Sequence, residues 1–284
     1  MKPSSTSWRG ATRAAASAKA IMELKITVLS KPGGRPVNED AYGFWSNESA
    51  CCCVMSDGAG GHAGGAVASK LAVAEILAWF RQRPDCSAGG IAEALRRANS
   101  AIVAMQQQSP QYARMRATVV VLAVDPARGT AIWGHIGDTR LYCFRDRRII
   151  LQTRDHSVLQ SMVDAGYLQS EDLRGAPQRN LLLAALGDGA EFEPRIEDAA
   201  FALRDGDIFL LCTDGFWEYV DELHMEGALS LAASGEAWLR QLESRVISEG
   251  SEGQDNYSAL VVACQEHAHQ EHAHEKQGQP EAPP

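Results

Sequence analysis

The feature that most constrains the fold is a run of four short apolar segments in the middle of the chain. Residues 117–125, 131–136, 140–145 and 148–153 are rich in β-branched and aromatic residues, which favour strands. Only two to five residues separate one segment from the next. Links this short predict strands that pair antiparallel with their neighbours in sequence.

Segments with helical spacing lie on both sides of this run. Helices are predicted at residues 66–82, 90–107, 157–167 and 236–248, with another starting at FWEYVDEL (216–223). Further strands are predicted at residues 23–29, 50–55, 207–213 and 256–264. Because strands and helix pairs do not alternate as regular βαβ units, we expect an α+β fold in which helices cover the sheets. We place it in one domain over residues 23–264.

Composition and charge argue against a disordered, a nucleic-acid-binding and a membrane protein. The chain has 284 residues, of which 45% are hydrophobic and 22% are charged, so it is not globally disordered. Its 27 Lys and Arg residues against 36 Asp and Glu residues give a net charge of −9, which disfavours nucleic acid as a partner. No apolar stretch reaches the length of about 18 residues that a membrane helix needs, so we expect no membrane contact.

The two ends of the chain differ from its body. Residues 1–22 carry four basic side chains and no acidic one, without the apolar segment of a secretory signal. We expect a disordered extension here, with a transit-like segment as the alternative. Residues 265–284 repeat Q-E-H-A-H and hold four of the eight histidines. We expect a disordered tail, with adventitious metal binding as the alternative.

The seven cysteines indicate a reducing compartment. They include no C-x-x-C pair, and three of them, Cys51, Cys52 and Cys53, are consecutive within an apolar run. Alternate residues of a strand point to opposite faces, so these three are expected to be small core residues. We therefore expect a cytoplasmic protein.

Five aspartates stand at the ends of predicted strands: Asp40, Asp57, Asp138, Asp214 and Asp255. If the strands share one region, several of these carboxylates converge at one rim. Gathered carboxylates repel one another, and the usual remedy is a hard divalent cation such as Mg²⁺, Mn²⁺ or Ca²⁺ rather than zinc. Taken singly, each aspartate has a simpler reading as a turn residue, particularly in the Asp57-Gly58 and Asp214-Gly215 pairs.

The glycine-rich segment 58–63 has a competing interpretation. It fits G-x-G-x-x-A between a strand and a helix, which is the dinucleotide-binding pattern. That pattern needs a second strand ending in an acid about 20 residues later, where this chain continues its helix. The sequence also lacks a P-loop, a Cys-x₅-Arg loop, a G-x-S-x-G elbow and an H-E-x-x-H motif.

Eight motifs, taken in order, carry a family resemblance. They are RPVNEDA (35–41), SDGAGGHAGGAVAS (56–69), RMRATVVV (114–121), GHIGDTRLYCFRD (134–146), TRDHS (153–157), NLLLAALG (180–187), GDIFLLCTDGFWE (206–218) and QDNYSALVV (254–262). The chain resembles the metal-dependent serine/threonine protein phosphatases of type 2C, in their compact bacterial form, over about residues 25–264. The resemblance implies two packed antiparallel β-sheets flanked by pairs of helices, a four-layer αββα sandwich with a binuclear metal site at one end.

The resemblance also implies the roles of particular residues. The groups that would hold two Mn²⁺ or Mg²⁺ ions, directly or through water, are Asp57 as the bridge, Asp40, Asp214, Asp255, the carbonyl of Gly58 and Glu39. Asp138 would bind a weaker third ion, and Arg35 would bind the phosphate, to which a guanidinium is suited.

The implied function is hydrolysis of phosphoserine or phosphothreonine in proteins by water that the two ions activate. The expected partners are phosphoproteins and a cognate Ser/Thr kinase, and the expected state is a monomer; some similar stand-alone bacterial phosphatases are associated with type VI secretion. The alternative is a phosphoprotein-binding pseudophosphatase. Three residues depart from the family pattern: Ala59 stands where some members have a histidine acid, Glu218 where Asp is common, and Arg116 where Gly is usual.

Overall fold

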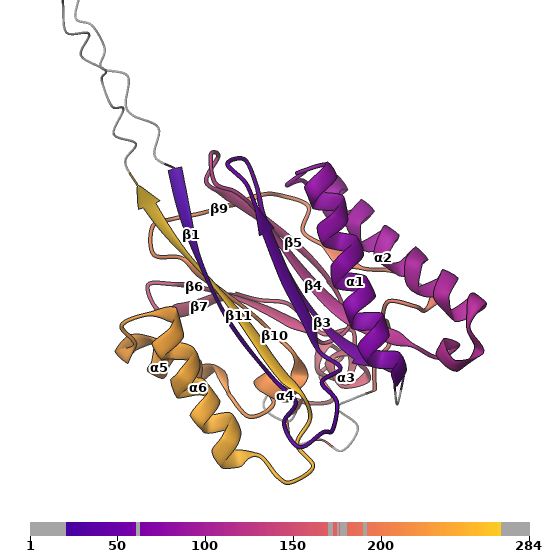
Figure 1. The fold of residues 1–284 in the computed structure, drawn as a ribbon. Helices are drawn as coiled ribbons and strands as arrows, with labels where there is room; N and C mark the ends of the chain where they lie inside the picture. Colours follow the sequence, from indigo (N-terminus) through magenta and orange to yellow (C-terminus); the bar gives the residue numbers. More distant parts are fainter. Residues whose placement is uncertain are drawn as a thin grey trace, which may run out of the picture.

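The computed structural model describes residues 21–60, 63–169, 173–174, 176, 181–189 and 192–267. Its strands form two antiparallel sheets that pack face to face (Figure 1). The first sheet has the order β1 (Ile21–Lys31), β11 (Tyr257–His267), β10 (Ile208–Cys212), β6 (Arg140–Arg145), β7 (Arg148–Gln152). The second has the order β2 (Ala41–Ser46), β3 (Cys51–Ala59), β4 (Arg116–Asp125), β5 (Thr130–Ile136), β8 (Arg195–Ile196), and β9 (Phe201–Ala202) also pairs with β5.

Helix pairs cover the outer faces of the two sheets (Figure 1). One pair is α1 (Ala63–Gln82) and α2 (Ala88–Gln108), and the other is α5 (Glu222–Leu231) and α6 (Gly235–Glu249). The shorter helices are η1 (Pro110–Tyr112), α3 (Val158–Asp164) and α4 (Asp214–Trp217). The layers therefore run helix, sheet, sheet, helix, which confirms the predicted α+β sandwich.

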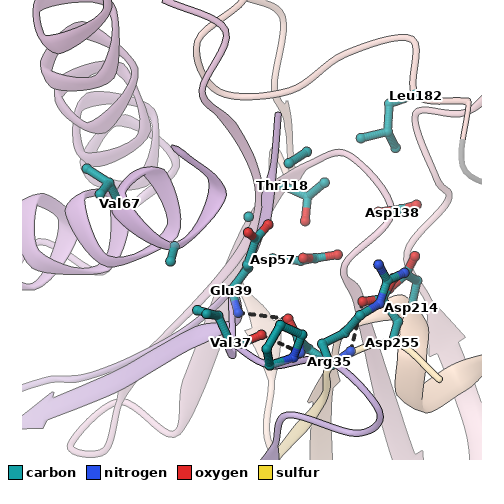
Figure 2. A pocket seen from close by; sticks show the side chains of 15 residues that line it. Arg35, Val37, Glu39, Asp57, Val67, Thr118, Asp138, Leu182, Asp214 and Asp255 are labelled. Carbon is teal, nitrogen blue, oxygen red and sulfur yellow. Dashed lines mark hydrogen bonds and ion pairs between the residues drawn. The ribbon is translucent and has the colours of Figure 1, made fainter. Parts of the chain in front are cut away.

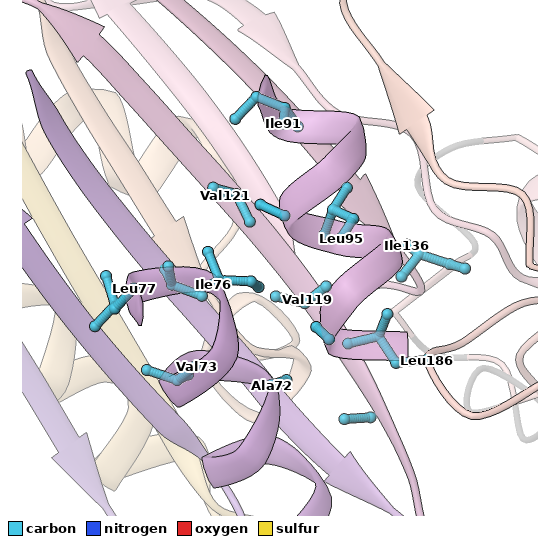
Figure 3. Packing of buried hydrophobic residues seen from close by; sticks show 14 of the residues in the cluster. Ala72, Val73, Ile76, Leu77, Ile91, Leu95, Val119, Val121, Ile136 and Leu186 are labelled. Atoms are coloured by element: carbon cyan, nitrogen blue, oxygen red, sulfur yellow. The ribbon is translucent and has the colours of Figure 1, made fainter. Parts of the chain in front are cut away.

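Strand β4 shows why the apolar run folds this way. Val119 and Val121 pack under α1 and α2, together with Ile76 and Leu95 from those helices (Figure 3). The alternate residues of the strand point the other way, into the core between the two sheets. A strand buried on both faces reads as a continuous apolar run, and burial of its side chains supplies the main driving force for the sandwich.

The three consecutive cysteines follow the same alternation. Cys52 faces the helix pair, whereas Cys51 and Cys53 face the other sheet. All three are buried and free, which confirms their prediction as core residues.

One predicted connection and one predicted helix start differ in the structure. Strands β5 and β6 are not paired neighbours, because the link through Gly137, Asp138 and Thr139 crosses from one sheet to the other. Gly137 has a φ of +96°, a conformation that glycine adopts without strain. The segment 216–223, expected to start a helix, instead contains the end of one helix and the start of another: α4 ends at Trp217, and α5 begins after Asp221, whose side chain accepts a hydrogen bond from the backbone N–H of His224.

Strand β2 was missed by the sequence patterns. Its segment AYGFWS contains Gly43, a residue that lowers strand propensity. The structure explains the glycine, since a Cβ at this position would lie 2.6 Å from the Leu77 side chain of α1.

The ends of the domain differ slightly from the predicted limits of 23 and 264. Strand β1 begins at Ile21 and β11 extends to His267, and these two residues pair with each other. Residues 1–20 and 268–284, on which the expected extension and tail mostly fall, lie outside the described residues. Among the described helices, none combines the length and the apolar character that crossing a membrane requires.

Candidate metal centre

The functional residues gather at one end of the sandwich. Because neighbouring strands are antiparallel, the end of β3 lies beside the start of β2, the end of β5 beside the start of β4, and the end of β10 beside the starts of β6 and β11. A cavity of about 890 Å³ opens at this end, and Asp57, Asp138, Asp214 and Asp255 all line it (Figure 2). Asp214 and Asp255 belong to connections of the first sheet, Asp57 belongs to a strand of the second, and Asp138 belongs to the link between the sheets, so the cavity lies across the sandwich.

Asp57 holds the central position. It stands near the end of β3, opposite Thr118 of β4 in the strand register. Burial raises the pKa of the Asp57 carboxyl well above its usual value, and the nearby charges of Asp214, Asp40 and Asp138 raise it further. A carboxylate at this position is therefore stabilised by any cation that enters the cavity.

Asp40 lies behind the cavity wall rather than on it. Its carboxyl is buried, and Oδ2 accepts a hydrogen bond of 3.0 Å from the Thr213 hydroxyl. The other oxygen, Oδ1, is buried and has no hydrogen-bond partner among the described residues. Burial raises the pKa of Asp40 to about 6, an effect that its hydrogen bonds to Ser258 and Thr213 reduce. An unpaired buried carboxylate oxygen fits a site built for a cation or for ordered water.

Asp214 and Asp138 lie close enough for their charges to affect each other. Asp214 is the first residue of α4, directly after β10, and Asp138 belongs to the link that crosses between the sheets. Burial raises the pKa of both groups, that of Asp138 to about 7, and Asp138 is the largest charge acting on Asp214. Helix α4 also fixes Asp138 directly, because the indole of Trp217 donates a 2.9 Å hydrogen bond to its backbone carbonyl.

The loop before β2 brings Arg35 and Glu39 to the cavity. Asn256, which is buried, donates hydrogen bonds of 2.8 and 3.0 Å to the carbonyls of Pro32 and Val37 and accepts one of 2.7 Å from the backbone N–H of Glu39. One amide side chain thus holds both ends of the loop to the start of β11. Arg35 extends from this loop across the cavity mouth toward Asp255 (Figure 2).

Gly58 permits a close approach of backbone at the cavity floor. A Cβ on Gly58 would lie 2.2 Å from the carbonyl oxygen of Gly65 in α1 and 2.8 Å from that of Glu39. Any side chain here would displace α1 or the Glu39 loop. Gly58 is therefore required where its own backbone lines the cavity, directly after Asp57.

The chemistry of this donor set fits hard divalent cations. The described lining of the cavity offers carboxylates, hydroxyls and backbone oxygens, and neither a cysteine nor a histidine is part of it. Among the described residues, no three His, Cys, Asp or Glu side chains are grouped closely enough to hold one ion by themselves. The carboxylates surround the cavity rather than meeting at a point, so an ion bound there would take carbonyl and water ligands as well.

The expected convergence of the aspartates is present, with Asp40 set one layer deeper than the others. The turn reading of two Asp-Gly pairs does not hold, since Asp57 lies within β3 and Asp214 begins α4. Asn256 and Thr118 were missed as site residues. Only their positions could have indicated a role: Asn256 follows Asp255 in the sequence, and Thr118 pairs with Asp57 across β3 and β4.

Comparison with known proteins identifies the family. The family model described as "Protein phosphatase 2C" matches residues 34–250. The chain belongs to the protein phosphatase 2C family. This membership agrees with the antiparallel αββα sandwich and explains why aspartates from both sheets share one cavity.

Individual family members show the same relationship. The chain is 32% identical over 213 residues to the serine/threonine protein phosphatase PstP of Mycobacterium tuberculosis, covering 73% of this chain but only 39% of PstP. It is 29% identical to the serine/threonine phosphatase Stp of Listeria welshimeri, covering 79% of this chain and 89% of Stp. The crystal structure of the PstP catalytic domain with two manganese ions superposes with a TM-score of 0.72 at 30% identity, covering 86% of this chain and 99% of that one.

Proposed function

We propose that this protein hydrolyses phosphoserine and phosphothreonine in other proteins, with two Mn²⁺ or Mg²⁺ ions bound in the cavity described above. The observation that carries the proposal is the gathering of Asp57, Asp214 and Asp255 with Arg35 around one cavity of a type 2C fold. The two manganese ions in the PstP catalytic domain support the choice of metal.

The residues divide by role. Asp57 would bridge the two ions, and the remaining ligands, some through water, would be Glu39, Asp40, the Gly58 carbonyl, Asp214 and Asp255. Asp138 would hold a weaker third ion beside Asp214. When bound, the ions supply an activated water molecule and neutralise charge on the phosphoryl oxygens.

The chain's own contribution is to position the substrate phosphate. Arg35 carries the one guanidinium in the described lining of the cavity, and its planar fork suits two phosphate oxygens at once. Asn256 keeps the Arg35 loop in place through its contacts with Pro32 and Val37. Ala59 carries no titratable group, so this chain supplies no acid for the leaving oxygen from that position.

The test is turnover of a phosphothreonine peptide. We expect release of phosphate that requires Mn²⁺ or Mg²⁺, stops on addition of EDTA and resists okadaic acid. An Asp57→Asn variant that folds normally should lose at least about a thousandfold in kcat/KM, the order of effect expected when an interaction made in the transition state is removed. Phosphopeptide binding without metal-dependent turnover would instead support the pseudophosphatase alternative.

The biological setting is a further part of the proposal. We infer a monomer in the bacterial cytoplasm that opposes a Ser/Thr kinase, as the family resemblance implies. Control of type VI secretion has one specific support: the chain superposes on PppA, described as a key regulatory component of that system in Pseudomonas aeruginosa, with a TM-score of 0.70 at 29% identity. Deleting the gene should raise phosphothreonine in the kinase's substrates, and deleting the kinase as well should abolish that rise.

A further inference from the structure

A second, smaller cavity of about 300 Å³ lies beside the candidate metal centre. Its charged and polar walls are Arg114, Arg116 and Gln106, and we call it the arginine pocket. It shares Ala59 with the larger cavity, so the two lie side by side. Arg116 is the residue that departs from the glycine usual in the family, and nothing in the proposed reaction uses it.

The register of two strands sets the spacing between the cavities. Asp57 of β3 pairs with Thr118 of β4, and Ala59, two residues later, pairs with Arg116. A strand rises about 3.3 Å per residue, so the arginine pocket begins about 7 Å from the Asp57 position. Side chains two residues apart in an extended peptide are separated by the same distance. An extended peptide that has its phosphate in the larger cavity and runs alongside β3 toward Ala59 would bring a nearby side chain to the arginine pocket.

Arg116 forms an ion pair with Asp188, whereas its Nε has no hydrogen-bond partner among the described residues. Its Nη2 lies 2.6 Å from Oδ1 of Asp188, and that carboxylate also accepts a 2.7 Å hydrogen bond from the backbone N–H of Ala185. The Nε of Arg116 is buried and has no hydrogen-bond partner among the described residues. The rest of the side chain is 38% exposed and lines the pocket, so the guanidinium remains accessible to an anionic ligand.

Arg114 adds a charge that no described residue compensates. Its side chain is exposed, and it has no ion pair with any described residue. The backbone beneath it packs closely against Gly60, since a Cβ on that glycine would lie 2.3 Å from the Arg114 carbonyl oxygen. Gln106 closes the opposite wall by donating from Nε2 to the carbonyls of Met115 and Gly187.

A purely structural role explains only part of this arrangement. An ion pair between Arg116 and Asp188 fastens the loop 181–189 to β4, but it does not account for Arg114. Asp188 compensates the charge of Arg116, so Arg114 gives the pocket a locally reversed charge beside a cavity lined by carboxylates, in a chain whose net charge is −9. Such a reversal favours an anionic group.

We propose that the arginine pocket binds an acidic group of the phosphoprotein substrate, either a carboxylate or a second phosphate, located about two residues from the phosphoresidue that is hydrolysed. This inference rests on the phosphatase function proposed above and assigns it a substrate class. Because the pocket is remote from the reacting phosphorus, it contributes equally to substrate and transition-state binding and acts on KM rather than kcat.

The experiment compares phosphothreonine peptides with the manganese-loaded full chain. One series carries Glu two residues before or after the phosphothreonine, a second carries phosphoserine there, and a third carries Gln. A fourth series places Glu five residues away, beyond the pocket. We expect Glu at the near position to lower KM about five- to tenfold relative to Gln, equivalent to about 1 to 1.4 kcal/mol, with kcat unchanged. The phosphoserine series distinguishes a doubly phosphorylated substrate from an acidic one.

Charge reversal tests the pocket itself. Arg114→Glu should abolish or invert the preference for the acidic peptide, and Arg116→Gln should reduce it. The matched control is Arg128→Glu, because Arg128 is an exposed arginine at the far end of β4, paired with Asp125. That variant should keep the preference.

The outcomes separate the two proposals. Equal KM values for the near-acid, far-acid and Gln peptides, with robust turnover, would overturn the arginine pocket and leave the phosphatase function standing. A preference that survives Arg114→Glu would also overturn the pocket. Absence of metal-dependent turnover for every peptide would reject the phosphatase function, and the substrate class would be rejected with it.

Discussion

The guanidinium of Arg35 lies 3.1 Å from the carboxylate of Asp255, so the candidate phosphate-binding cation is paired with a candidate metal ligand. The two side chains are 53% and 42% exposed, and ion pairs this exposed contribute about 1 kcal/mol or less. The pair is therefore easily exchanged. If the proposed roles hold, a cation at Asp255 would release Arg35, and a phosphate in the cavity would give it a better, bidentate partner.

Replacing Arg35 should consequently weaken substrate binding more than metal binding. We expect Arg35→Ala to lower kcat/KM for a phosphothreonine peptide about 10- to 100-fold, which corresponds to about 1.4 to 2.7 kcal/mol. The affinity for Mn²⁺, measured by calorimetry, should change far less, because removing Arg35 also removes a competitor for Asp255. Arg35→Lys should recover only part of the loss, since lysine lacks the planar fork. A variant with unchanged kcat/KM would exclude Arg35 from phosphate binding.

Metal removal should change stability as well as activity. Ions that bind the folded chain at about 100 times their Kd stabilise it by about 2.7 kcal/mol. We expect Mn²⁺ to raise the Tm of the protein and EDTA to reverse the rise, as followed by scanning calorimetry. Asp57→Asn should lose most of the Mn²⁺-dependent rise. The Arg128→Glu protein is the control, and a rise of equal size in the Asp57 variant would contradict the bridging role.

The sequence predicted the location of the site better than the arrangement of the sheets. Aspartates at strand ends converge in any antiparallel layout that places those ends together, so Asp57, Asp138, Asp214 and Asp255 could be grouped in advance. The division into two sheets could not, because a three-residue link such as 137–139 serves equally as a hairpin or as a crossing between sheets. Only the packing of long-range partners decides between these alternatives.

The missed residues illustrate a second limit. Asn256 organises the loop that carries Arg35 and Glu39, yet an isolated asparagine after an aspartate is also a common turn residue. Its role depends on contacts with Pro32 and Val37, more than 200 positions away in sequence. Metal-ligand types can be recognised by their chemistry, whereas residues that position them are recognised only once the fold has brought the segments together.

Asp138 should make the metal-free protein less stable as pH rises. Burial raises its pKa from 3.8 to about 7, and a carboxyl whose folded pKa is raised stabilises the fold below pH 3.8 and loses that contribution as pH rises toward 7. Asp138→Asn should therefore stabilise the EDTA-treated protein, by up to a few kcal/mol above pH 7 and by little near pH 4. Urea unfolding at several pH values measures the difference, and a gain independent of pH would contradict this origin.

His135 should act in the opposite direction. Its Nε2 lies 2.8 Å from the carbonyl oxygen of Arg154, so this nitrogen carries the proton, and Nδ1 is buried without a partner among the described residues. Burial lowers its pKa from 6.5 to about 4, and an imidazole with a lowered pKa loses stability as pH falls from about 6.5 to about 4. His135→Gln should flatten the stability profile in this window. This variant is the counterpart of Asp138→Asn. If its stability fell as steeply with falling pH as that of the parent protein, His135 would not be the cause of the pH dependence.

Gly58→Ala tests whether close backbone approach is required at the cavity floor. The new Cβ would lie 2.2 Å from the Gly65 carbonyl oxygen, so either α1 or the loop carrying Glu39 must move. Backbone cannot yield as a flexible side chain can, and we expect more than about a tenfold loss of kcat/KM, since small displacements of positioned groups are costly to catalysis. The matched control is Gly129→Ala, a glycine with φ +63° and open space around it, which carries the strain of a positive φ without a clash. If both variants lost stability alike but kept full activity, the packing of Gly58 against α1 would not position the metal ligands.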